Sequence, residues 1–175
     1  ALDVDQLEHV KHLVRLLAPE VGMFKVGKQL FTCAGPQAVR LIHEIGGEVF
    51  LDLKFHDIPT TVAKAAVEAT RLGVKMFNVH ASGSLEMMRA TVKEVHRICR
   101  PEKRRQPIMV AVTVLTSLNQ DDLKRVGVDG KVADQVVRLA LLTKEAGMDG
   151  VVASPHEVAD ICYACGRPFV IVTPG

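Results

Sequence analysis

Short apolar segments alternate with amphipathic segments along most of the chain, and this alternation is the strongest structural signal in the sequence. Nearly continuous apolar runs predict strands that are buried on both faces, as in a parallel sheet. The predicted strands are residues 23–26, 49–53, 76–80, 108–114, 150–153 and 169–173. Leu2 is interpreted as the tail of an earlier strand, so the pattern predicts the end of strand 1 followed by strands 2 through 7.

Between the predicted strands, apolar residues recur at intervals of three and four, which predicts amphipathic helices. The positions expected to face the core are Leu7, Val10, Val14 and Leu17, then Val62, Ala66 and Ala69, then Leu85, Met88, Val92 and Val95, and finally Val132, Val136, Ala140 and Leu141. Asp5 with Glu8, and Ser154 with Glu157, have the spacing of capping boxes. Pro59 suits the first turn of the helix that follows it.

Strands that alternate with helices fit either a (β/α)8 barrel (TIM barrel) or a doubly wound sheet. No GxGxxG follows an early strand, which argues against a dinucleotide-binding sheet. Polar residues instead gather where predicted strands end, as is typical of a barrel: Asp3, Lys25, Asp52, Lys54, Asn78, His80, Thr113, Thr116, Ser154 and Thr173. Asn78, Thr113 and Ser154 are interpreted as ordinary loop starts. We predict one α/β TIM-barrel domain over residues 1–175, truncated at both ends and lacking the last strand and its helices.

Composition limits the class of protein and its partners. The chain is 48% hydrophobic and 24% charged, as in a folded globular protein, and its net charge of +2 does not favour nucleic-acid binding. No apolar run is long enough to span a bilayer, and no secretory signal pattern is present. The scattered Cys33, Cys99, Cys162 and Cys165 do not form a disulfide framework, and the CxxC spacing of the last two lacks a second ligand pair. We expect reduced thiols in a cytoplasmic protein with no membrane or nucleic-acid partner.

The segment Asp52-Leu53-Lys54-Phe55-His56-Asp57 concentrates charge at the end of a predicted strand. Residues two apart on a strand point the same way, so Asp52 and Lys54 should share the mouth of the barrel. Lys25 ends the preceding strand beside them and Asp57 follows on the loop, so lysines and aspartates would alternate in a small desolvated space. A salt-bridge network that only holds the barrel together is the alternative, but such networks contribute little net stability.

Residues 52–62 resemble the signature of the orotidine 5′-monophosphate decarboxylases, in particular their bacterial branch. Residues 1–3, 23–27, 78–81, 112–117 and 172–175 resemble further segments of that family in the same order. The resemblance therefore covers essentially the whole chain. Thr60 departs from it, because many members carry asparagine there, but the charged residues are unaffected.

The resemblance implies decarboxylation of orotidine 5′-monophosphate to UMP in pyrimidine biosynthesis, with no metal or other cofactor. Lys54 would donate a proton to C6 of the pyrimidine, and Asp52 would lie against the substrate carboxylate. Lys25 would neutralise the aspartates and form a hydrogen bond to the ribose. Asp3 would bind the ribose hydroxyls, and Thr116 would recognise the pyrimidine edge. The chemistry is consistent: losing CO₂ leaves a carbanion at C6, which a fixed ammonium stabilises and then protonates.

The resemblance also implies that a complete active site needs residues from a partner subunit and residues that follow the seventh strand. Asp57 and Thr61 would reach the active site of a partner subunit, which makes the enzyme a homodimer with shared sites. A phosphate-binding glutamine and arginine would follow the seventh strand, so the sequence is expected to be incomplete at its C-terminus.

Two other functions stay open at this point. Mg²⁺-dependent sugar-phosphate decarboxylases or synthases of the same wider barrel family carry a similar Asp-x-Lys-x-x-Asp strand, but they have an acidic residue where Lys25 would repel a cation. A non-catalytic nucleotide-binding barrel is the other, because fold alone does not establish activity. His80 either supports Lys54 without contacting the substrate or is a core histidine, and the role of His56 is equally open.

Overall fold

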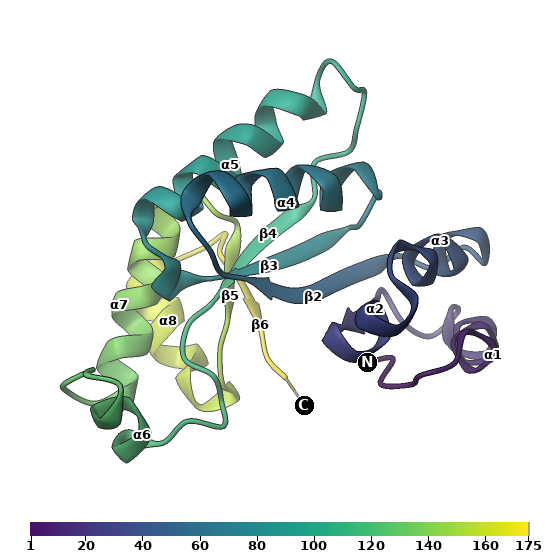
Figure 1. Cartoon of the computed structure of the whole chain (residues 1–175). Coiled ribbons are helices and arrows are strands. Elements are labelled where there is room, and N and C mark those ends of the chain that lie inside the picture. The colour runs from purple at the N-terminus through teal and green to yellow at the C-terminus, as the bar shows by residue number, and fades with distance from the viewer. Residues whose placement is uncertain (175) are drawn as a thin grey trace.

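The computed structural model describes residues 1–174, and its centre is a curled parallel sheet with helices on the outside (Figure 1). Within these residues the sheet has six strands: β1 (Phe24–Gly27), β2 (Val49–Phe55), β3 (Met76–His80), β4 (Ile108–Val112), β5 (Gly150–Val152) and β6 (Val170–Val172). Their order in the sheet is their order in the chain, and every pairing is parallel. The helical connections explain this order, because each returns the chain to the same end of the sheet.

The sheet is open, with β1 and β6 at its two edges in the described part of the chain. The backbone N–H of Leu2 donates to the carbonyl of Lys25 at 2.9 Å, so the N-terminal segment runs beside β1, although Leu2 itself is not in a strand. Six of the predicted strands are thus present, and Leu2 lies where the end of a preceding strand was expected. The open sheet agrees with the predicted incomplete barrel.

The helices follow the predicted alternation with some additions. They are α1 (Leu7–Leu17), α2 (Lys28–Ala34), α3 (Pro36–Glu44), α4 (Pro59–Arg71), α5 (Leu85–Cys99), α6 (Gln120–Arg125), α7 (Val132–Glu145) and α8 (Val158–Cys165), with short 3-10 turns at Ala81–Gly83 and Pro155–Glu157. Helices α2, α3 and α6 were not predicted. Gly35, with a φ of 56°, separates the first two, and α6 has only 6 residues, so none of them shows a long periodic pattern. No helix of residues 1–174 is both long and apolar enough to cross a membrane.

Most of the predicted core positions of the helices are buried, including Val10, Val14, Val62, Ala66, Ala69, Met88, Val95, Val136 and Ala140. Leu17 and Leu141 are 36% and 45% exposed, so their assignment to the core was wrong. The capping box at Asp5 was also wrong, because α1 begins after Gln6 and no side chain caps it. The box at Ser154 is confirmed and opens the turn before α8.

Apolar residues pack on both faces of the sheet, which explains why the strands read as continuous apolar runs. The main core lies between the strands and the helices and includes Leu51 and Phe77. A smaller cluster of Phe50, Met76 and Val110 packs separately from it. Phe50 also lines the cavity described below, so this cluster lies on the cavity side of the sheet.

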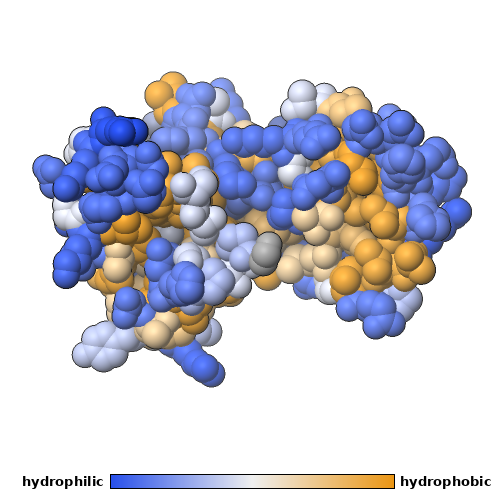
Figure 2. Space-filling model, turned by 90° about the horizontal axis from the view of Figure 1, so that it is seen from below, coloured by the Kyte–Doolittle hydropathy of each residue, from blue (hydrophilic) through white to orange (hydrophobic). Residues whose placement is uncertain are grey.

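Gly150 of β5 pairs with Val170 of β6. A Cβ atom placed on Gly150 would lie 2.0 Å from the carbonyl oxygen of Val170, so a residue with a side chain does not fit without moving a strand. Large apolar side chains are exposed near both ends of the strand order, at Leu16 and Val21 around α1 and at Tyr163 in α8. Figure 2 shows apolar surface on both sides of a central hollow.

Candidate active site

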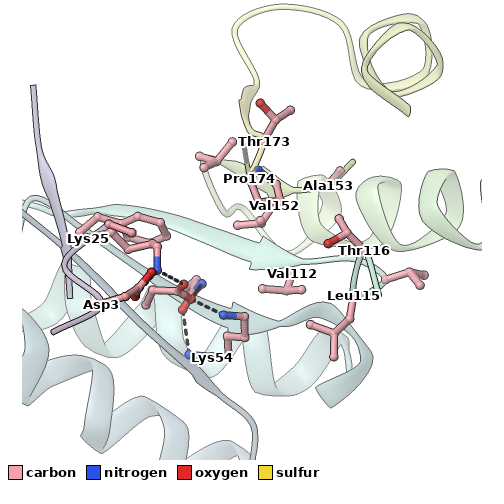
Figure 3. Close-up of a pocket in the computed structure, with 16 residues that line it drawn as sticks. Asp3, Lys25, Lys54, Val112, Leu115, Thr116, Val152, Ala153, Thr173 and Pro174 are labelled. Atoms are coloured by element: carbon pink, nitrogen blue, oxygen red, sulfur yellow. Dashed lines mark hydrogen bonds and ion pairs between the residues drawn. The ribbon is translucent and has the colours of Figure 1, made fainter. Parts of the chain in front are cut away.

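A cavity of about 630 Å³ opens at the carboxyl ends of the strands. Its lining includes residues from the N-terminal segment, from every strand and from the loops that follow β4 and β6: Asp3, Lys25, Asp52, Lys54, Asn78, Val112, Thr116, Val152, Val172 and Thr173. In Figure 3, Asp3, Lys25 and Lys54 face Thr116, Val152 and Thr173 across it. A cavity of this size and mixed lining suits a small-molecule ligand, and its position is where barrels carry their chemistry.

Four charged side chains along one wall form an alternating array, Asp3–Lys25–Asp52–Lys54. Lys25 Nζ lies 3.9 Å from Asp3 Oδ1 and 3.5 Å from Asp52 Oδ2, and Lys54 Nζ lies 2.6 Å from Asp52 Oδ1. Asp52 is therefore held between two ammonium groups. Direct ion pairs hold these four charges in place, and charges that are already positioned need little rearrangement when a charged substrate enters.

Asp57 does not join this array within its own chain. It is exposed, and its Oδ1 accepts a hydrogen bond from the backbone N–H of Ile58 at 2.7 Å. The fourth charge of the array is therefore Asp3, which lies beside Lys25, whereas Asp57 was expected beside Lys54. Asp57 and Thr61 instead line a second hollow of about 250 Å³, which Lys54 also lines.

Asp52 is 9% exposed and has three polar neighbours. Its Oδ1 accepts from Lys54 Nζ and, at 2.7 Å, from Asn78 Nδ2. Burial opposes ionisation of this carboxyl, but the hydrogen bonds from Lys54 and Asn78 and the charges of Lys54 and Lys25 outweigh it and lower the pKa of Asp52. Asp52 is consequently a carboxylate at neutral pH.

Lys54 lies at an irregularity in β2, where the pairing with β3 shifts between Leu51 and Phe55. Its φ of 53° falls in the left-handed region, which is rare for a residue with a side chain and costs about 1–2 kcal/mol. Its backbone N–H donates to Asn78 Oδ1 at 2.8 Å. Asp52 and Lys54 do meet as predicted, but through this bulge and not through regular alternation along a flat strand.

His80, at the end of β3, stacks against His56 with 5.2 Å between ring centroids. Burial, followed by the charges of His56, Lys28 and Lys54, lowers the pKa of His80 to about 4. His80 is therefore neutral at pH 7. It is absent from the lining of the larger cavity, so it does not face a ligand there.

The depressed pKa of His80 predicts a specific dependence of stability on pH. His80 binds a proton near pH 6.5 in the unfolded chain but only near pH 4 in the folded chain. Its contribution to the free energy of unfolding is therefore fully present above pH 6.5 and is lost as the pH falls toward 4. We expect a loss of roughly 2 kcal/mol, because partial exposure reduces the full effect. Denaturant unfolding at several pH values would measure it. The variant His80→Gln should lose distinctly less over this window, and equal losses would contradict the assignment. The lowered pKa of Asp52 affects stability in a lower pH range, below the ordinary pKa of an aspartate.

Other reactive groups contribute little to this site. Burial raises the pKa of the Cys99 and Cys165 thiols, so neither is a thiolate at neutral pH. Across residues 1–174, no group of three or more His, Cys, Asp and Glu side chains is placed to share one metal ion.

The fold and the site define the class, a (β/α)8-barrel protein with a charged site at the carboxyl ends of its strands. The chain belongs to the orotidine 5′-phosphate decarboxylase / HUMPS family, whose model matches residues 1–175. This confirms the family that the sequence segments predicted, including the incomplete TIM barrel.

Individual relatives agree with this assignment. The chain is 56% identical over 175 residues to the orotidine 5′-phosphate decarboxylase of Geotalea uraniireducens and 57% identical to that of Syntrophotalea carbinolica, covering all of this chain and 72% of each relative. Among solved structures, the orotidine 5′-phosphate decarboxylase of Lactobacillus acidophilus superposes with a TM-score of 0.86 at 35% identity, over 99% of this chain and 78% of that one.

The structure brings together most of the residues predicted for the site. Asp3, Lys25, Asp52, Lys54 and Thr116 all line the larger cavity, whereas Asp57 and Thr61 do not. One further residue, Asn78, was interpreted as a loop start and instead contacts both members of the central ion pair. A signal was present in the sequence, because an amide inside an apolar strand must find buried hydrogen-bond partners.

Proposed function

We propose that this protein decarboxylates orotidine 5′-monophosphate to UMP in pyrimidine biosynthesis, without a metal or other cofactor. The observation that carries the proposal is the buried carboxylate of Asp52 held between Lys25 and Lys54 on the wall of the cavity. Family membership supplies the substrate, because the relatives that match over the whole chain are named for this activity.

The reaction needs a group that stabilises negative charge at one carbon. When the bond between C6 and the carboxyl group breaks, CO₂ leaves and the electron pair stays on C6. The ammonium of Lys54 stabilises this charge and then gives its proton to C6, which yields UMP. Lys54 regains its proton from solvent. In this scheme Asp52 faces the substrate carboxylate and holds the Lys54 ammonium in place through their ion pair.

The other lining residues bind the substrate. Lys25 and Asp3, which lie 3.9 Å apart, contact the ribose hydroxyls. Thr116 lies across the cavity from the charged wall and recognises the edge of the pyrimidine (Figure 3).

We further propose a cytoplasmic homodimer in which each active site uses Asp57 and Thr61 of the partner. Two observations support this arrangement. Lys54 lines both cavities, so a partner residue that enters the smaller one comes close to the same lysine. Ile58, next to Asp57, exposes 64% of its surface, as is common for a residue that a partner covers.

A turnover assay with purified protein and orotidine 5′-monophosphate tests the proposed function. Release of CO₂ and formation of UMP at equal rates is the expected result. Protein that binds UMP but forms none from the substrate would be a non-catalytic nucleotide-binding barrel, and the proposal would fail.

Turnover should be indifferent to chelators. Two lysines occupy the wall of the cavity, where a Mg²⁺ site would need oxygen ligands, and their charges repel a divalent cation. The rate in excess EDTA should match the rate in buffer containing Mg²⁺. Activity that disappears in EDTA and returns with Mg²⁺ would favour the sugar-phosphate enzymes of the same wider barrel family.

A further inference from the structure

Asn78 is a buried polar residue of the cavity for which the proposed chemistry has no use. It lies within β3, between the buried Phe77 and Val79, and is 1% exposed. Its side chain reaches across to β2 with both ends. Oδ1 accepts from the backbone N–H of Lys54 at 2.8 Å, and Nδ2 donates to Asp52 Oδ1 at 2.7 Å.

The orientation of this amide is fixed by the chemistry of its partners. A backbone N–H can only donate, and an ionised carboxylate can only accept. Turning the amide over would set its oxygen against Asp52 and its NH₂ group against the N–H of Lys54. A single side chain therefore meets both demands in one orientation, which a smaller polar residue could not do.

Both contacts lie at the point where β2 departs from regular geometry. The ladder between β2 and β3 is interrupted between Leu51 and Phe55, so the N–H of Lys54 has no place in a regular ladder. Asn78 Oδ1 supplies the missing acceptor and holds the positive φ of Lys54. Asn78 Nδ2 and Lys54 Nζ also share one acceptor, Asp52 Oδ1, so the amide fixes the carboxylate to which the lysine is bonded.

We infer that Asn78 is a positioning residue, which holds the backbone of Lys54 and the carboxylate of Asp52 in the arrangement needed for proton transfer. The inference rests on the proposed function, because it concerns the same site. Asn78 acts through its two neighbours and not on the substrate. Its loss should therefore lower kcat far more than it raises KM.

The test uses two variants and one matched control. Asn78→Ala removes both hydrogen bonds, whereas Asn78→Asp keeps the shape and the acceptor for Lys54 but loses the donor to Asp52. Thr113→Val is the control: Thr113 is also buried, follows the neighbouring strand β4, and its hydroxyl donates to the uncharged carbonyl of Val152. We expect kcat to fall about 100-fold in Asn78→Ala with KM changed by less than about threefold, because misplacement of a catalytic group by about 1 Å has effects of this size. Thr113→Val should keep kcat within about twofold, because it leaves the ion pair untouched.

The pH profile separates positioning from a merely structural role. The charged and titratable groups near Asp52 are Lys25 on β1, Lys54 on β2 and His80 on β3, with Asp3 reached through Lys25. Asn78→Asp adds a second carboxyl beside Asp52, and two adjacent carboxyls cannot both ionise easily. The acidic limb of kcat/KM should therefore move to higher pH by about one unit or more. Thr113→Val should leave it in place.

The outcomes distinguish this inference from the proposed function. If wild-type protein does not decarboxylate the substrate, the proposed function fails. If wild-type protein is active, the inference is overturned when Asn78→Ala matches Thr113→Val in kcat, or when the acidic limb of Asn78→Asp does not move. Circular dichroism checks folding, and if Asn78→Ala does not fold, Asn78→Asp decides through its kcat and its pH profile.

Discussion

Replacing Lys54 by alanine should abolish nearly all turnover while the protein remains folded. The substitution removes both the charge that stabilises the carbanion and the proton that C6 receives, so we expect kcat to fall on the order of 10³-fold or more. The fold should persist, because the Lys54 side chain is 25% exposed at the rim of the core and does not fill it. Steady-state kinetics and circular dichroism measure the two effects.

A matched control for this experiment is Lys93→Ala. Lys93 is exposed on α5 and is not among the residues that line the cavity, so the same chemical change there should leave turnover as in wild type. Turnover of Lys54→Ala within tenfold of wild type would mean that another group protonates C6. Asp52 would then need a different explanation, because it would be an ion-pair partner of a residue without a catalytic role.

Mixing two inactive variants should restore activity if the active sites are shared between subunits. In a hybrid of Lys54→Ala and Asp57→Ala subunits, one of the two sites receives wild-type Lys54 from its own chain and wild-type Asp57 from the partner. Random exchange at equal concentrations should therefore return about a quarter of the wild-type activity, since half of the dimers are hybrids with one intact site each. Native mass spectrometry can establish that subunits have exchanged.

The control mixture pairs Lys54→Ala with Lys25→Ala. Lys25 and Lys54 both contact Asp52 of the same chain, so neither site of this hybrid is intact and no activity should return. Recovery in the first mixture alone supports the trans position of Asp57. Demonstrated exchange without recovery in the first mixture would place Asp57 outside the partner's site.

The elements that sequence predicted well are those whose burial leaves a long, regular pattern. Strands β2 to β6 are nearly continuous apolar runs, and α4, α5 and α7 repeat apolar residues over several turns. Helices α2 and α3 were missed because Gly35 divides them into pieces too short for periodicity to show. The capping box at Asp5 failed because spacing alone does not fix where a helix begins, and α1 starts after Gln6.

The sequence predicted which charged residues form the site, but not how they are arranged. Lys25, Asp52 and Lys54 follow from strand ends and from the family signature, and the structure places them together. The alternation rule assumes a regular strand, so it could not show that Lys54 lies in a bulge with positive φ. The same rule could not predict the partners of Asn78. Its hydrogen bonds join β3 to β2, and the register between two strands is set only in the folded sheet.

The contact at Gly150 links a position that touches no ligand to the dimensions of the cavity. Val152 and Val172, two residues further along β5 and β6, are paired with each other and both line the cavity wall. A single methyl group at Gly150 would collide with the backbone of Val170 and force β6 outward, taking Val172 with it. A substitution at Gly150 should therefore reshape the binding site, although Gly150 is not among the residues that line it.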